Sequence, residues 1–446
     1  MRNTEATYKL GIEFVNWGRI GDAYIHPFGD FGRSMNGIGF HQYWLRMHRT
    51  GQEPDIGEYS LPVVAAKAGR FAYPSSDPAS VLSSYSYAYQ LDSSLYAQYL
   101  RSYSEARGVT RHEGKVVDVS LNAENGFIEA VTLDDGRRLA GQLFIDCSGF
   151  RGLLIEQALA AGYEHWKHWL PCDRAIAIPS EKVGETTPYT RATADVSGWR
   201  WRIPLRHRTG NGHVYSSDHI SDEAALEALY DGLDGEPLAE PNYLRFATGR
   251  RKRAWLRNCV AIGLSAGFLE PLESTGIHLI QLGIMKLIEF FPDANCDPAN
   301  AREFNRVMQM EIERIRDFLI LHYTATERTD STFWNDCRNL QKPEELEERM
   351  ALFESRGHVV RYTEGLFLEP SWVAVYLGQG ILPRHHDPRI DSHRIEALTA
   401  QMERLKGLIR GAAHSLPAHD LALRQYEQPG GTADGWKHAA MNLYRN

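Results

Sequence analysis

GLSAGFLEPLESTG, at residues 263–276, is the stretch of this 446-residue sequence that most constrains the fold. It follows an apolar run at 259–263 that is typical of a buried strand. After it, apolar residues recur at helical spacing: Ile277, Ile280, Ile284, Leu287 and Ile288. A strand that passes through a loop of small residues into a helix is an α/β arrangement. We therefore expect an α/β fold with a helix that begins near Thr275.

The start of this helix also offers chemistry. Backbone N–H groups at a helix start bind anions, and the helix dipole adds a favourable potential for them. Glu273 places a carboxylate just before Ser274, Thr275 and Gly276, where a halide could bind. In the alternative interpretation, Glu273 and Ser274 only cap the helix. These residues alone leave both interpretations open.

The rest of the chain continues the α/β pattern and then becomes helical. A helix is expected over 92–107, because Asp92 offers an N-cap and apolar residues follow at helical spacing. Asn-Gly and Asp-Gly turn signals divide a β-meander into strands at 115–121, 127–133 and 138–146, the last ending in a buried strand at 143–146. Further strands are expected at 198–205 and 213–217, on either side of a turn at 209–212, and helices at 311–323 and 395–408. We divide the chain into an α/β domain, 1–292, and a mainly helical C-terminal region, 293–446.

Three further side chains are candidates for a site. Trp199 and Trp201 alternate within an expected strand, so their side chains should lie on the same face of it. Paired indoles can shield a cofactor, and core packing is the alternative. Lys9, taken alone in an N-terminal segment, would be a solvated surface charge.

Composition and charge exclude several classes of function. A formal net charge of -8, with no basic tract beyond residues 250–253, argues against a nucleic-acid partner. We expect that short basic run to be ordinary surface or interdomain charge. The five cysteines have neither zinc-site nor disulfide-framework spacing, and no signal peptide or membrane span is found. We therefore expect a cytoplasmic protein without a metal site.

Taken together, four motifs resemble those of the flavin-dependent tryptophan halogenases, in the same order. They are the tryptophan pair, the 263–276 segment, DCSGFRG at 146–152 and ATYKLGIEFVNW at 6–17. The resemblance runs from residue 6 to about residue 383. It implies a flavin-monooxygenase-like fold with a Rossmann-type FAD module, a β-sheet substrate part and a helical C-terminal region. It also implies an enzyme that uses FADH2, oxygen and chloride or bromide to halogenate an electron-rich aromatic ring, such as tryptophan or an indole.

The resemblance carries residue roles with it. Lys9 matches the family's catalytic lysine, and Glu273 matches its essential glutamate. The halide would lie beside Ser274, Thr275 and Gly276. Cofactor contacts are expected from Trp199, Trp201, Gly263, Gly267 and Pro271, and substrate contacts from His26 and Phe28. The implied partners are a small aromatic substrate and a separate flavin reductase that supplies FADH2, and a homodimer is compatible with the sequence.

Two features depart from the family pattern. No GxGxxG fingerprint occurs in the chain, although in the family it precedes the lysine motif. We therefore expect an N-terminally incomplete halogenase that binds FAD poorly. At the substrate end, residues 361–383 lack the family's Tyr-Tyr pair, so a simpler indole or another aromatic is favoured over free tryptophan.

Two other functions stay open at this point. The chain could be a flavin-dependent hydroxylase that keeps the fold, and its product would then carry a hydroxyl group whether or not halide is present. It could also be a non-catalytic, truncated relic that binds a partner, in which case neither this chain nor an extended version would bind flavin.

Overall fold

The computed structural model describes residues 1–51, 55–362 and 365–425. It divides into two compact units, each built from separate parts of the chain. Unit 1 comprises 1–100, 175–244 and 321–446, and unit 2 comprises 101–174 and 245–320. The sequence predicted two consecutive domains that meet near residue 292. The two compact units group the chain in another way, so this domain division stays a prediction.

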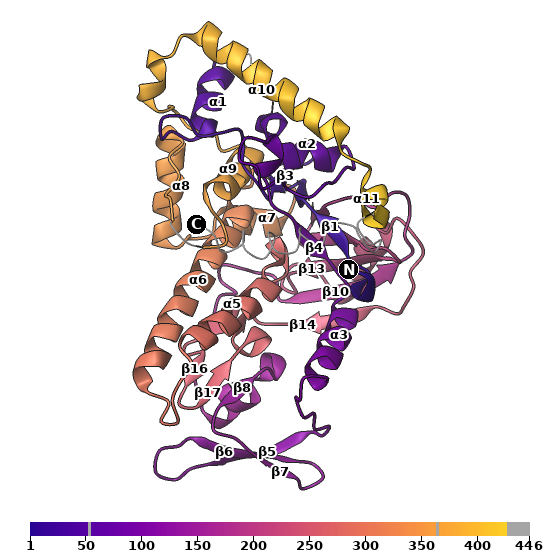
Figure 1. Ribbon diagram of the computed structural model, residues 1–446, viewed down its shortest axis with the longest axis vertical. Helices are drawn as coiled ribbons and strands as arrows, with labels where there is room; N and C mark the ends of the chain where they lie inside the picture. The colour runs from indigo at the N-terminus through magenta and orange to yellow at the C-terminus, as the bar shows by residue number, and fades with distance from the viewer. Residues whose placement is uncertain (52–54, 363–364, 426–446) are drawn as a thin grey trace. The chain divides into compact units, whose positions relative to one another are not determined.

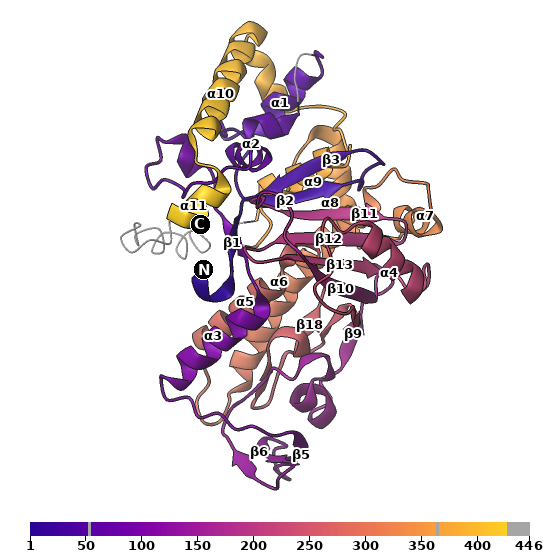
Figure 2. The same cartoon turned by 90° about the vertical axis from the view of Figure 1, so that its right-hand side faces the viewer.

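Unit 1 is organised around a seven-stranded sheet in the order β14-β10-β13-β12-β11-β2-β3. Figure 2 shows β3, β2, β11, β12, β13 and β10 following one another in this order. β11 runs parallel to β2, whereas β3 pairs with β2, and β12 with both β11 and β13, in antiparallel fashion. The strands are β2 (Gly11–Val15), β3 (Ala23–Pro27), β10 (Arg174–Ser180), β11 (Thr190–Asp195), β12 (Gly198–Pro204), β13 (Thr209–Tyr215) and β14 (Asn242–Arg245). β1 (Thr7–Lys9) and β4 (Ala88–Gln90) form a separate antiparallel pair.

The turn predicted at 209–212 is wrong, because those residues belong to β13. The hairpin register pairs Pro204 with Thr209, which places the loop at 205–208 instead. The glycines at 210 and 212 are therefore strand residues. A Cβ at Gly212 would lie 2.0 Å from the Trp201 ring, so a glycine is needed there to admit the indole.

Helices cover the unit 1 sheet and dominate the chain after residue 298, as the sequence predicted. α9 lies against β3, and α10 lies against α2. A core of aromatic and aliphatic side chains, including Tyr8, Leu10 and Phe71, joins β3, α2 and α10. The helices are η1 (Arg2–Thr4), α1 (Phe40–His48), η2 (Ile56–Tyr59), α2 (Leu61–Lys67), η3 (Val81–Ser83), α4 (Asp222–Asp231), α7 (Thr332–Arg338), α8 (Glu344–Arg356), α9 (Glu369–Gly378), η8 (Pro388–Ser392), α10 (Ile395–Ser415) and α11 (His419–Gln425); α3 (Ser93–Glu105) and α6 (Pro298–Thr324) each cross the division between units.

Unit 2 contains three small sheets. β8 runs parallel to β17, which pairs with β16, and Figure 1 shows these three strands together. The expected strand at 138–146 is in fact two strands, because β7 stays with β6 while β8 changes partner to β17. The strands are β5 (Val116–Leu121), β6 (Ile128–Leu133), β7 (Arg138–Ala140), β8 (Phe144–Asp146), β9 (Tyr163–His165), β15 (Gly249–Arg251), β16 (Trp255–Leu256), β17 (Cys259–Ala261) and β18 (Gly267–Phe268). The helices are η4 (Gly149–Arg151), η5 (Leu153–Ala158), η6 (Gly263–Ser265), η7 (Leu272–Ser274) and α5 (Gly276–Glu289).

One face of α5 is both apolar and exposed. Of the predicted apolar residues only Leu287 is buried, whereas Ile284 is 44% and Ile288 67% exposed. β8 lies at the edge of its sheet, and its central residue Ile145 is 40% exposed. The buried strand predicted at 143–146 is therefore buried only at its end, at Asp146. Among the described residues, no helix is long and apolar enough to cross a membrane.

The basic run at 250–253 is not surface charge throughout. Arg250 and Arg251 lie in β15 and are 8% and 6% exposed. Arg250 pairs with Glu164 and Glu313, each at 3.0 Å, and Arg251 pairs with Glu156 at 2.8 Å. These two buried arginines therefore pair with partly exposed carboxylates within unit 2.

His419, the first residue of α11, links this helix to β1. Its Nδ1–H donates to the Thr186 carbonyl oxygen at 2.8 Å, and its Nε2 accepts from the Tyr8 N–H at 3.2 Å. Both bonds require the neutral ring, and burial lowers the pKa of His419 to about 4. The strand that carries Lys9 is therefore fastened to α11 by a histidine in its neutral form.

We expect this bond pair to make the protein less stable in mild acid. A histidine whose folded pKa lies below its unfolded value of about 6.5 contributes fully above that pH and loses the contribution as the pH falls toward 4. This one group should cost about 2 kcal/mol of unfolding free energy between pH 7 and pH 5. His419→Gln, whose amide both donates and accepts, should remove that part of the pH dependence. Urea unfolding of both proteins at the two pH values measures it, and equal pH dependence would contradict the assignment.

Candidate active site

Lys9 is the last residue of β1 and is only 4% exposed. The preceding residue, Tyr8, anchors the strand: its ring stacks on Phe71 at 3.9 Å, and its hydroxyl lies 2.6 Å from that of Tyr73. Because successive side chains on a strand point to opposite sides, this anchor directs Lys9 away from the tyrosine cluster. The lysine side chain is therefore buried and is not the solvated surface charge that its position in the sequence indicates.

The ring of Phe28 lies beside the end of the Lys9 side chain, and further aromatic rings pack next to Phe28. The Lys9 Nζ lies 5.5 Å from the centroid of the Phe28 ring. The Phe28 N–H donates to the carbonyl oxygen of Leu10 at 2.8 Å, which fixes the two segments side by side. The His26 ring lies 6.3 Å from that of Phe28 and 5.9 Å from that of Phe367. The structure thus brings together Lys9, His26 and Phe28, and adds Phe367 to them.

The tryptophan pair lies on the central strand β12. In the register with β11, Trp199 pairs with Ala194 and Trp201 with Ala192. The two indole rings are 6.2 Å apart, as expected for side chains on one face of a strand. Trp199 is 2% exposed, and its Nε1 is buried without a hydrogen-bond partner among the described residues. A buried N–H without an acceptor is costly and is a donor that a bound group could satisfy.

The loop after β17 in unit 2 needs glycine at two positions. Gly263 has a φ of +75°, which favours glycine. Gly267 pairs with Arg250, and a Cβ there would lie 2.6 Å from the Gly249 carbonyl oxygen. The loop therefore keeps its backbone close to β15 before the chain reaches Pro271 and η7.

Three non-glycine residues between this loop and α5 adopt the left-handed backbone conformation. Their φ values are +51° at Glu270, +64° at Glu273 and +59° at Ser274. This conformation costs roughly 1–2 kcal/mol per residue, and such strain clusters at functional sites. Thr275 takes the N-cap position of α5 and makes no side-chain capping hydrogen bond. Glu273 and Ser274 are thus not the N-cap, although capping was the alternative interpretation of these residues.

The environment of Gly276 leaves room beside the helix start. Gly276 is the first residue of α5, and a Cβ there would meet nothing within 4 Å. Thr275 is 2% exposed, whereas Ser274 is exposed. The first N–H groups of a helix lack partners within the helix, so this end has donors for an anion.

Glu270 resembles Glu273 in burial and in backbone conformation, and the sequence patterns did not single it out. It is 2% exposed, compared with 8% for Glu273, and it shares the left-handed conformation. Nothing in the pattern FLEPLE separates the two glutamates. Only their burial and backbone conformation, which long-range packing determines, single out Glu270.

The region expected to contact the substrate, residues 361–383, contains a cluster of charged side chains around Glu369 in unit 1. Residues 363–364 lie outside the described residues. Glu369 forms an ion pair with Arg361, and its Oε1 lies 3.5 Å from the His41 Nδ1. Burial, and then the neighbouring Glu369, raise the pKa of Asp30, which follows Phe28 by two residues. The Glu369 carboxylate therefore already has two basic neighbours.

The candidate residues fall into two sets. Unit 1 contains Lys9, His26, Phe28, Trp199 and Trp201, and unit 2 contains Gly263, Gly267, Pro271, Glu273, Ser274, Thr275 and Gly276. Within unit 1 the structure brings the lysine, His26 and Phe28 together and pairs the two tryptophans. Within unit 2 the glycine loop leads through Pro271 into the strained segment and the start of α5.

Comparisons with known proteins agree in sequence and in fold. The Tryptophan halogenase family model matches residues 1–394. Tryptophan 6-halogenase SttH from Streptomyces toxytricini is 33% identical over 440 residues, 93% of this chain and 83% of that protein. The solved structure of BrvH, a flavin-dependent halogenase from Brevundimonas sp. BAL3, is 48% identical with a TM-score of 0.93, covering 95% of this chain and 87% of that one. A flavin-dependent halogenase from Xanthomonas campestris is 46% identical with a TM-score of 0.93, covering 96% and 85%.

Proposed function

The chain belongs to the tryptophan halogenase family and is a flavin-dependent halogenase of aromatic substrates, and we propose that Lys9 and Glu273 are its catalytic residues. The observation that carries this proposal is the burial of Lys9 with its amine beside the Phe28 ring. A buried ammonium group is costly. An ammonium near an aromatic face is stabilised by the ring quadrupole, and it is well placed to act on a second aromatic ring bound beside it.

Family membership implies FAD, a halide, an aromatic substrate and a flavin reductase as partner. When bound and reduced, FAD supplies the reaction with oxygen that oxidises the halide. The residues of this chain fit part of the FAD molecule. We infer contacts from the glycine loop at Gly263 and Gly267, from Pro271, and from Trp199 and Trp201. The supporting observation is the buried Trp199 N–H, which lacks an acceptor among the described residues. A homodimer, which is compatible with the sequence, stays a prediction.

The chain's own residues would then control the oxidised halogen. The halide binds at the backbone N–H groups beside Ser274, Thr275 and Gly276, where the helix dipole favours an anion. The Lys9 amine holds the oxidised halogen and presents it to one ring carbon, which is catalysis by positioning. His26 and Phe28 position the ring. Glu273 stabilises the cationic ring intermediate and removes its proton, as a general base does.

We propose that the substrate is a simple indole or another aromatic without a free ammonium group. A carboxylate in the substrate region would be the natural partner of an amino acid's ammonium group. Glu369, however, is already paired with Arg361 and lies beside His41. A substrate ammonium would have to displace these partners.

We expect kcat/KM with bromide to be at least about tenfold higher for indole than for free tryptophan, the factor that one lost charged hydrogen bond produces. The measurement is the yield of brominated product by mass spectrometry, with both substrates at equal concentrations. Arg361→Gln removes the ion-pair partner of Glu369 and should reduce the ratio of kcat/KM between indole and tryptophan. Arg33→Gln, at an exposed arginine outside this cluster, is the control and should leave the ratio unchanged. Preference for tryptophan in the wild type would refute this substrate class.

We also infer that the active halogenase needs a glycine-rich strand–helix unit that residues 1–446 do not contain. Parallel strands are normally covered by helices on both faces, yet β8 has an open edge and α5 an exposed apolar face. Contiguous exposed apolar surface of this kind marks a binding interface. A strand beside β8 with a helix over α5 would cover both features.

Residues 1–446 alone should bind FAD weakly, and a protein extended by a strand followed by GxGxxG should bind it tightly. The cofactor's pyrophosphate needs backbone N–H donors at a glycine-rich helix start, and the fingerprint is absent from this sequence. Flavin fluorescence quenching, measured on both proteins at equal concentration, gives the two dissociation constants. Tight, stoichiometric binding by residues 1–446 would refute the inference.

A further inference from the structure

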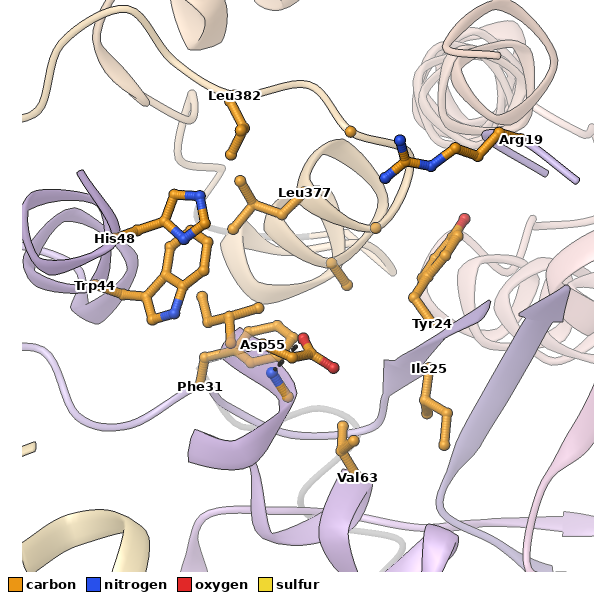
Figure 3. Close-up of a pocket in the computed structure, with 15 residues that line it drawn as sticks. Arg19, Tyr24, Ile25, Phe31, Trp44, His48, Asp55, Val63, Leu377 and Leu382 are labelled. Atoms are coloured by element: carbon orange, nitrogen blue, oxygen red, sulfur yellow. Dashed lines mark hydrogen bonds between the residues drawn. The ribbon is translucent and has the colours of Figure 1, made fainter. Parts of the chain in front are cut away.

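Unit 1 contains a cavity of about 310 Å³ that is separate from the cluster around Lys9. Residues of β3, α1, η2 and α9 line it, and neither Lys9 nor His26, Phe28 or Phe367 is among them (Figure 3). Its volume lies at the lower end of the range for small-molecule sites, roughly 300–1,000 Å³. The cavity is therefore large enough for one small ligand and not for a cofactor such as FAD.

One wall of the cavity is flat and aromatic. The rings of Trp44 and His48, one helical turn apart on α1, stack 4.6 Å apart with an interplanar angle of 20°. Figure 3 shows this pair facing Leu377 across the space, with Phe31 and Val63 below. Apolar side chains beside a planar aromatic wall favour a ligand with a flat apolar body.

The polar groups at the cavity are arranged for an anion. Arg19 extends its guanidinium toward Leu377, and it forms no ion pair within the described ranges (Figure 3). The Nδ1 of His48 is buried and has no hydrogen-bond partner within those ranges either. The one carboxylate on the lining, Asp55, already accepts from the Gly57 N–H at 2.9 Å and lies 3.5 Å from the Lys67 Nζ. Among the lining residues, the positive charge of Arg19 therefore has no partner, and the carboxylate that acts on it is that of Asp22, which lies outside the lining.

We propose that this cavity is a second ligand site, which binds a small aromatic carboxylate. The ring of the ligand lies against Trp44 and His48, and its carboxylate is held by the Arg19 guanidinium, whose planar fork matches a carboxylate. His48 is a second hydrogen-bonding partner at the ring end. The site is independent of halogenation, because it shares no residue with the candidate active site.

Isothermal titration of the 446-residue chain with indole-3-acetate, and with its neutral analogue indole-3-acetamide, tests the proposal. We expect indole-3-acetate to bind about tenfold or more tightly than the amide, as charge-assisted hydrogen bonds require. Arg19→Gln should abolish this preference. Arg33→Gln, an exposed arginine on the same unit, should leave it unchanged. Leu377→Trp, which fills the cavity, should weaken binding of both ligands.

Lys9→Ala separates this site from the candidate active site, because it alters the candidate active site and leaves the cavity lining intact. Binding of indole-3-acetate with an unchanged dissociation constant in Lys9→Ala supports the second site. Loss of binding in Lys9→Ala, no binding by the wild type, or an acid-over-amide preference that survives Arg19→Gln would each overturn the proposal. Circular dichroism of each variant establishes that it is folded.

Discussion

Replacing Lys9 with alanine is expected to abolish halogenated product, a loss of more than about 10³-fold, because positioning of reactants supplies an effect of this size or larger. Oxidation of reduced flavin by oxygen should continue, since that reaction does not involve the Lys9 side chain. The amine is buried beside the Phe28 ring, and no other lysine is placed in this cluster among the described residues. Product is measured by mass spectrometry, and peroxide release is measured in the same samples, both with the protein that binds FAD.

Alanine at this buried position leaves a cavity, which could itself lower activity. A second variant therefore separates the loss of the amine from the loss of side-chain volume. Lys9→Met retains most of the side-chain volume and removes only the amine, and it should lose product to the same extent. Lys115→Ala, at an exposed lysine in unit 2, is the matched control and should behave as the wild type. Product yield at the wild-type level in either Lys9 variant would remove this lysine from the mechanism.

Replacing Glu273 with glutamine should slow halogenation by roughly 10²–10⁴-fold, which is typical of a lost general base. The change is nearly isosteric, so the left-handed backbone at this position and the start of α5 should survive. FAD binding should stay close to that of the wild type. Single-turnover product formation, followed by rapid quenching and mass spectrometry, isolates the chemical step.

Glu270 provides a matched control for this variant. It is also buried and left-handed, and it lies three residues before Glu273. We assign the proton transfer to Glu273 alone, so Glu270→Gln should keep activity within about tenfold of the wild type, the effect of one hydrogen bond. If Glu270→Gln lost more activity than Glu273→Gln, the general base would have to be reassigned.

Local sequence patterns predicted much of the fold. The strands expected at 127–133 and 198–205 are β6 and β12, and the helix expected near Thr275 begins at Gly276. The fold class and the family were also predicted, because they rest on motifs spread along the chain, and the comparisons confirm both. Errors arose where a strand's partner lies far away in the sequence. Residues 138–146 form two strands because Phe144–Asp146 pairs with a strand more than a hundred residues later.

The environment of the site residues was less predictable. Lys9 is buried because Tyr8 anchors its strand in an aromatic cluster and Phe28 covers its amine, and these contacts link separate parts of unit 1. Arg250 and Arg251 are buried and pair with carboxylates that are distant in the sequence, which no local pattern reveals. The left-handed Glu273 is equally invisible, since glutamate rarely adopts that conformation.

The most direct test of the account is the identity of the product formed from indole with FADH2 and oxygen, with and without bromide, by a protein that binds FAD. High-resolution mass spectrometry distinguishes bromination, with its paired bromine isotopes, from hydroxylation. We expect a monobrominated indole that forms only when bromide is present and that disappears in Lys9→Ala. A hydroxylated product that forms equally well without halide would contradict it, and would mean that the buried lysine and the paired tryptophans belong to a monooxygenase.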